Sequence, residues 1–176
     1  MSDFSEPVIA VPRKRGISRY SPAVIIVAPL VAILFTVYVP QLIPQLAYLA
    51  LPLLVTVYFS LMKRSQVGGV FLGAAIGLVQ DSLSHQPIGM FGIVKTLVGY
   101  FAASVSLRFD VGNVVIRFLL AFFFYFFHEF FYWVLARALL GQAIDFSARQ
   151  TLILGTLNAV VAIPLFHILD KLRVTE

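Results

Sequence analysis

Long apolar runs separated by short polar interruptions dominate the chain. A helix rises about 1.5 Å per residue, so roughly 20 apolar residues cross the hydrocarbon core of a bilayer. Runs of about this length lie at residues 22–39, 45–62, 67–83, 90–107, 114–140 and 150–169. The pattern predicts an all-α, polytopic membrane protein with six transmembrane helices in one bundle. For the third and fourth runs, a re-entrant hairpin is the alternative to two separate crossings.

The polar interruptions predict the turns and the topology. Pro40 and Pro44 should bracket the first turn, Ser84 to Pro87 should break the third run, and residues 141–149 should form a polar loop. Ten of the thirteen basic residues fall on one set of flanks, and only Arg137 and Arg149 fall on the other. Because basic residues are enriched in cytoplasmic loops, both termini are predicted to be cytoplasmic. We therefore expect a cytoplasmic arm at 1–21, a transmembrane domain at 22–170 and a cytoplasmic tail at 171–176.

Composition agrees with this class of protein. Hydrophobic residues make up 60% of the chain, charged residues 12%, and the mean hydropathy is +0.95. A soluble chain with this balance would lack polar surface. No cysteine is present, which excludes disulfides and thiolate chemistry. The basic residues that give the net charge of +5 are scattered between apolar runs, so we expect contact with the lipid bilayer and no nucleic acid.

A stripe of small residues marks the third run. Gly69, Gly73, Gly77 and Asp81 follow one another at intervals of four, which places them along one helix face. The fourth run carries a second stripe of small residues, which contains Gly99 and is bordered by Lys95. Small residues let two helix backbones approach closely within lipid. The two stripes therefore predict tight packing between these helices.

Asp81 and Lys95 are ionisable groups at membrane depth, where a charge is costly. One interpretation is structural: the two side chains form an ion pair, or Asp81 accepts hydrogen bonds from the turn at 84–89. The other is functional, with Asp81 in a site for a coupling ion or a substrate. The structural interpretation is favoured because Asp81 lies close to a helix end.

The fifth run is rich in aromatic residues, which surround the helix between Phe122 and Trp133. Glu129 should face the bundle and bond Tyr125, Asn158 or a basic partner, because a carboxylate facing lipid is costly. His128 and Glu129 are types of residue that bind metals, but adjacent residues point about 100° apart on a helix, so no metal site is predicted. Part of the aromatic wall is expected to bind a partner helix. The candidates are Phe122, Phe126, Phe130 and Trp133.

Asn158 lies in the middle of the sixth run, where it can bridge helices by hydrogen bonds. The chain contains no phosphate-binding loop, nucleophile elbow, zinc-protease motif or dinucleotide fingerprint. We therefore expect a protein that is not an enzyme and that uses no cofactor.

One segment resembles a known family. Gly77-Leu78-Val79-Gln80-Asp81-Ser82-Leu83, followed by Pro87-Ile88-Gly89-Met90 and by Gly99-Tyr100, is similar to the signature of the rod shape-determining protein MreD family. Asp81 matches the acidic position of that motif. The resemblance implies a fold similar to the substrate-binding subunits of energy-coupling-factor transporters, which are bundles of six helices, and it carries no catalytic residues.

The resemblance also implies a function. It would make the protein a non-enzymatic scaffold of the bacterial cell-elongation machinery in the inner membrane, which controls cell shape by organising the partners of peptidoglycan synthesis. The expected partners are an MreC-like membrane protein, an MreB-like filament and a RodA–penicillin-binding-protein synthase. The alternative is a small-molecule-binding subunit of a membrane transporter, which would need several polar groups converging on a concave site.

Overall fold

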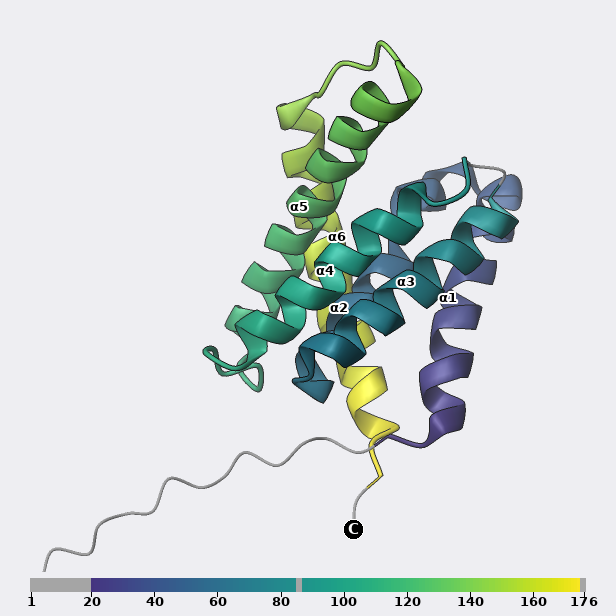
Figure 1. Cartoon of the computed structure of the whole chain (residues 1–176). Helices are drawn as coiled ribbons and strands as arrows, with labels where there is room; N and C mark the ends of the chain where they lie inside the picture. The colour runs from purple at the N-terminus through teal and green to yellow at the C-terminus, as the bar shows by residue number, and fades with distance from the viewer. Residues whose placement is uncertain (1–19, 85–86, 175–176) are drawn as a thin grey trace, which may run out of the picture.

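The computed structural model of the chain describes residues 20–84 and 87–174, so most of the predicted arm and the turn residues His85 and Gln86 lie outside the described residues. The regular secondary structure of the described chain is helical, and one isolated antiparallel bridge joins Tyr20 and Arg173 (Figure 1). Its elements are α1 (Pro22–Leu42), the 3-10 helix η1 (Pro44–Tyr48), α2 (Leu51–Lys63), α3 (Gln66–Leu83), α4 (Met90–Ser106), α5 (Val114–Leu140) and α6 (Ala148–Lys171).

Five helical segments in the described chain are long and apolar enough to cross a membrane. They are Pro22–Leu42, Pro44–Lys63, Gln66–Leu83, Val114–Leu140 and Ala148–Lys171. The helix α4 is also apolar but is shorter, with 17 residues. The chain is therefore a multi-pass membrane protein, and a count of six crossings stays a prediction.

The helix α2 forms the centre of the bundle. All its residues from Pro52 to Met62 are buried, and it packs against α1, α3, α4, α5 and α6. A helix that is hydrophobic all round is expected at such a position. Tyr58 and Phe59 of α2 form edge-on ring contacts with Tyr20, which fixes the start of α1 to the same end of the bundle as the end of α2.

The remaining helices pack as two pairs around this centre. Figure 1 shows α3 and α4 running side by side, and α5 and α6 running side by side at an angle to them. The start of α1 and the end of α6 lie at one end of the bundle, where the Tyr20–Arg173 bridge joins them. The loop between α5 and α6 lies at the opposite end.

The second predicted crossing is interrupted, which differs from the expectation of a continuous helix at 45–62. The chain forms η1, leaves helical geometry at Leu49 and Ala50, and then starts α2. Pro52 explains the break, because proline has no backbone N–H to donate to the carbonyl four residues earlier, at Tyr48. The first turn also begins later than expected, since α1 continues through Pro40 to Leu42.

Asn158 of α6 supplies hydrogen bonds to the backbone at this break. Its amide nitrogen donates to the carbonyl of Tyr48 at 2.9 Å, and its amide oxygen accepts from the backbone N–H of Ala50 at 2.8 Å. Asn158 is fully buried. Backbone polar groups within the hydrocarbon must be satisfied inside the protein, so Asn158 makes the interruption tolerable.

Replacing Asn158 by Leu should destabilise the fold, because it leaves a buried carbonyl and a buried N–H without partners. Each unsatisfied group costs about 1–3 kcal/mol, so we expect a clear decrease in the melting temperature of the purified protein in detergent. Thr156→Ala on the exposed face of α6 is the matched control, since the Thr156 hydroxyl bonds only to its own helix. Equal melting temperatures for the two variants would contradict this role.

Candidate functional site

The seam between α3 and α4 brings two helix backbones into direct contact. A side chain added at Gly69 would collide with the carbonyl of Gly99, one at Gly73 with the carbonyl of Lys95, and one at Gly77 with Phe91 and Gly92. Gly68, one residue from Gly69, faces only the Ser65 side chain. The small-residue stripe of α3 therefore lies against α4 along most of its length.

Asp81 of α3 accepts three hydrogen bonds from the start of α4. Its carboxylate oxygens receive the backbone N–H groups of Gly89 at 2.9 Å, Phe91 at 3.0 Å and Gly92 at 3.0 Å. The first N–H groups of a helix have no partner within it, and the helix dipole favours a negative charge there. Gly89 has no side chain that could cap α4, and its φ of 100° suits glycine. Asp81 thus caps α4 from a neighbouring helix while only 1% exposed.

Lys95 is buried one helix turn further along α4 and does not bond Asp81. Its ammonium lies over the Phe91 ring, 4.3 Å from the centroid, and its exposure is 1%. Within the described part of the chain, no hydrogen bond or ion pair joins Lys95 to another side chain. Of the two structural alternatives for Asp81, the structure therefore contains the one in which the turn and the helix start hold the carboxylate.

His128 and Glu129 of α5 line the same partly open cavity as Lys95. The Nδ1 atom of His128 lies 3.2 Å from the Glu129 carboxylate, and the His128 ring stacks on Phe91. Glu129 does not bond Asn158, which contacts the break before α2 instead. Among the described residues, no three His, Asp or Glu side chains cluster as metal ligands would.

The aromatic residues of α5 divide between the interior, a loop and the outer surface. Phe122 packs against Gly155 of α6. Phe126, Phe130 and Trp133 surround Phe146 of the loop before α6, with ring centroids about 6 Å apart. Trp133 also donates its indole N–H to the carbonyl of Ile144 at 2.8 Å. Much of the predicted partner-binding set is thus in contact with the chain's own loop.

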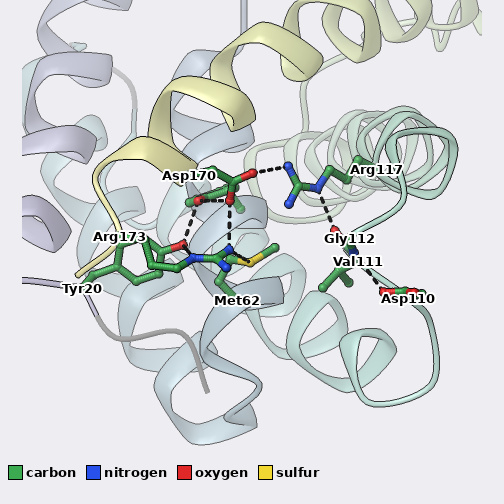
Figure 2. A network of polar contacts seen from close by, with 9 residues as sticks. Tyr20, Met62, Asp110, Val111, Gly112, Arg117, Asp170 and Arg173 are labelled. Atoms are coloured by element: carbon green, nitrogen blue, oxygen red, sulfur yellow. Dashed lines mark hydrogen bonds and ion pairs between the residues drawn. The ribbon is translucent and has the colours of Figure 1, made fainter. Parts of the chain in front are cut away.

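A polar network lies at the other end of the bundle, around Asp170 in the last turn of α6 (Figure 2). Tyr58 of α2 donates to the Asp170 carboxylate at 2.7 Å, Arg117 of α5 at 2.5 Å and Arg173 at 2.9 Å. The hydroxyls of Tyr20 and Tyr58 are 2.7 Å apart. The network joins α2, α5 and α6 to the segment that precedes α1.

The charge of Arg173, which follows α6, is favoured by this setting. Burial alone would lower its pKa, but a hydrogen bond to the Tyr20 hydroxyl and the charge of Asp170 outweigh that effect and raise the pKa of the guanidinium. Arg173 therefore stays charged at any physiological pH.

The sequence pattern did not point to Asp170. Arg117 and Arg173 were counted there only among the ten basic residues that predict the topology. One signal was available: a carboxylate in the last turn of a helix opposes the helix dipole and needs a compensating cation. Which cation supplies it depends on how α5 packs against α6, and that contact is not visible in the hydropathy pattern.

The comparison with protein families decides the classification. Residues 18–173 match the family described as rod shape-determining protein MreD. The chain belongs to the MreD family. Its members determine rod shape, so this protein is a shape-determining, multi-pass membrane protein. The match covers nearly the whole chain, well beyond the motif around Asp81 that suggested it.

No curated protein and no solved structure matches the chain. The expected similarity to the substrate-binding subunits of energy-coupling-factor transporters therefore stays a prediction, as do the roles of individual residues.

Replacing Asp81 by Ala should destabilise the α3–α4 pair and weaken recovery of partners together. The change leaves three N–H groups at the start of α4 without an acceptor, and each unsatisfied buried group costs about 1–3 kcal/mol. Asp81→Asn should be milder, because an amide oxygen can still accept. Thermal unfolding in detergent and co-purification from membranes measure the two effects. Unchanged stability combined with lost partner recovery would instead favour a direct functional role for Asp81.

Larger side chains in the seam should separate α3 from α4. Gly73→Leu and Gly77→Leu should prevent folding or lower the melting temperature strongly, because each collides with backbone atoms that cannot move independently. Gly68→Ala and the volume-preserving Leu72→Ile are the controls. If Gly73→Leu and Gly77→Leu proteins fold and form complexes normally, the close packing of α3 on α4 is wrong.

Proposed function

We propose that this MreD-family protein is a non-enzymatic scaffold in the inner membrane that organises the partners of peptidoglycan synthesis during cell elongation. The observation that carries the proposal is a connected surface of aromatic rings on α4 and α5. Tyr100, Phe101, Phe123, Phe127, Phe130 and Phe131 form this aromatic face, with neighbouring ring centroids 4.4–6.1 Å apart.

The face is both exposed and rigid. Phe123 is 51% exposed and Phe130 is 40% exposed, while Phe124 and Ala121 of the same helix are fully buried. Rings that already contact one another lose little freedom when a second helix packs on them, and they offer large areas for dispersion contacts. These properties suit a partner helix better than fluid lipid alone.

The partner expected at this face is the MreC-like membrane protein. Of the residues proposed from sequence, Phe130 lies within the face and Trp133 contacts the Phe130 ring. Phe126 contacts Phe146 of the α5–α6 loop, and Phe122 packs on Gly155. An MreB-like filament would approach from the cytoplasm. The RodA–penicillin-binding-protein synthase would be reached within the membrane or through the MreC-like partner.

The proposed orientation places both termini in the cytoplasm. The Asp170 network, with Arg117 and Arg173, then lies on the cytoplasmic side. Lys63, Arg64 and Arg108 fall on the same side if each helix from α2 to α5 crosses the membrane once. This arrangement follows the preference of basic residues for cytoplasmic flanks.

Photo-crosslinking tests the aromatic face. A photoreactive phenylalanine analogue at Phe123 or Phe130 should yield adducts with a membrane-spanning partner in cells. The same analogue at buried Phe124, or at Ile153 on α6, should not. Ile153 is the matched control because it is 60% exposed and equally apolar but lies on another helix. Adducts can be identified by mass spectrometry. Partner labelling of equal strength at Ile153, or lipid adducts alone throughout 122–133, would remove this interface.

A further inference from the structure

A partly open cavity of about 260 Å³ lies in the half of the bundle opposite the Asp170 network. Its wall includes the non-helical backbone from Tyr48 to Ala50, together with Gln80 of α3, Lys95 of α4 and Glu129 of α5. Non-helical backbone at membrane depth is tolerated where it is buried in protein or lines a polar cavity. The interruption before α2, whose backbone is hydrogen-bonded to Asn158, therefore borders this space.

Two buried polar groups at the cavity lack partners. Gln80 is 7% exposed and His128 is 4% exposed, yet the amide oxygen of Gln80 and the Nε2 atom of His128 receive no hydrogen bond in the described structure. The Lys95 ammonium, 1% exposed, lies over the face of Phe91. Buried polar groups are nearly always paired in native proteins, so two unpaired groups beside a buried lysine point to a bound molecule.

The chemistry of the wall defines what that molecule must offer. Lys95 presents N–H donors and suits an accepting, anionic group of a ligand. Gln80 presents a carbonyl oxygen and requires a donor. His128 places Nδ1 against the Glu129 carboxylate, which makes Nδ1 the protonated nitrogen and leaves Nε2 as an acceptor that also requires a donor.

A second cavity, of about 220 Å³, continues toward the α5–α6 loop and shares Tyr125, Glu129 and Leu154 with the first. Its wall carries two carboxylates, Glu129 and Asp145. A bound molecule is therefore favoured when its positively charged group lies on the side of the loop and its negatively charged group lies at Lys95.

We propose that the inner cavity binds one small zwitterion, with its anionic group at Lys95 and its ammonium donating to Gln80 and Glu129. A free amino acid and the ethanolamine headgroup of a phospholipid share this chemistry. The site lies across α4 and α5 from the aromatic face, so it is a binding activity additional to the scaffold role, and its test does not depend on any partner protein.

The first test uses the full chain, purified in a detergent without lipid amines. Melting temperatures are measured with a pool of the twenty amino acids at millimolar concentration, and then with alanine, propanoate and ethylamine separately. A ligand that binds the folded state raises the melting temperature. The pool is expected to raise it, whereas propanoate and ethylamine, which carry one charge each, are not.

The second test distinguishes the lipid source. The protein is reconstituted in nanodiscs of phosphatidylglycerol alone or of phosphatidylglycerol with phosphatidylethanolamine. Stabilisation by phosphatidylethanolamine without any effect of free amino acids identifies the headgroup as the ligand. Stabilisation by free amino acids identifies a soluble ligand.

Variants decide whether the cavity is responsible. Lys95→Met should weaken binding of the stabilising ligand about 10- to 100-fold, because it removes a charge-assisted hydrogen bond. Glu129→Gln should weaken it as well, while the amide oxygen can still accept from His128 and so preserve the local contact. Lys171→Met, at the exposed end of α6, is the control and should bind normally. No stabilisation by either source, or undiminished binding in both Lys95→Met and Glu129→Gln, would overturn the proposal.

Discussion

The structure depends on one constraint: inside the hydrocarbon, every backbone N–H and C=O must find a partner within the protein. Two places in this chain cannot meet it through helical bonds, the interruption before α2 and the start of α4. Asn158 supplies both a donor and an acceptor at the first, and Asp81 supplies acceptors for three N–H groups at the second. These polar side chains, which hydropathy alone marks as costly, are what allow the neighbouring helices to end or break within the bundle.

Once the helix ends are satisfied, packing decides the rest. The glycines of α3 bring its backbone against α4, and Asp81 joins the same two helices at one end of the seam. Close packing and capping therefore support each other, because the carboxylate reaches the first amides of α4 only when the helices lie close together. The central helix α2 is held differently. Asn158 contacts the chain just before its start, and Asp170 bonds Tyr58 near its end, so α6 fixes α2 near both ends.

The sequence was sufficient for the features that repeat along a helix. Apolar runs located the helices, with α5 placed at its observed bounds, and the spacing of Gly69, Gly73 and Gly77 indicated a packing face. Features that depend on which helices meet were not accessible. The Asp170 network joins residues more than fifty positions apart, and Asn158 bonds backbone groups that exist as a break only because of Pro52. Proline at the start of a helix and proline inside a longer helix look alike in a hydropathy pattern, so the interruption could not be placed from sequence.

The polar cavity and the aromatic face lie on the same two helices, which connects the two proposals mechanically. Lys95 and Phe101 are on α4, separated by about 9 Å of helix rise, while His128 and Phe127 are adjacent on α5. The ring contact between Phe101 and Phe127 sets the spacing of α4 and α5 on the outer side, and the groups around Lys95 set it on the inner side. The cavity is also lined by residues of α1, η1, α2, α3 and α6. The two proposed sites therefore share α4 and α5 as supports, while their contact residues do not overlap.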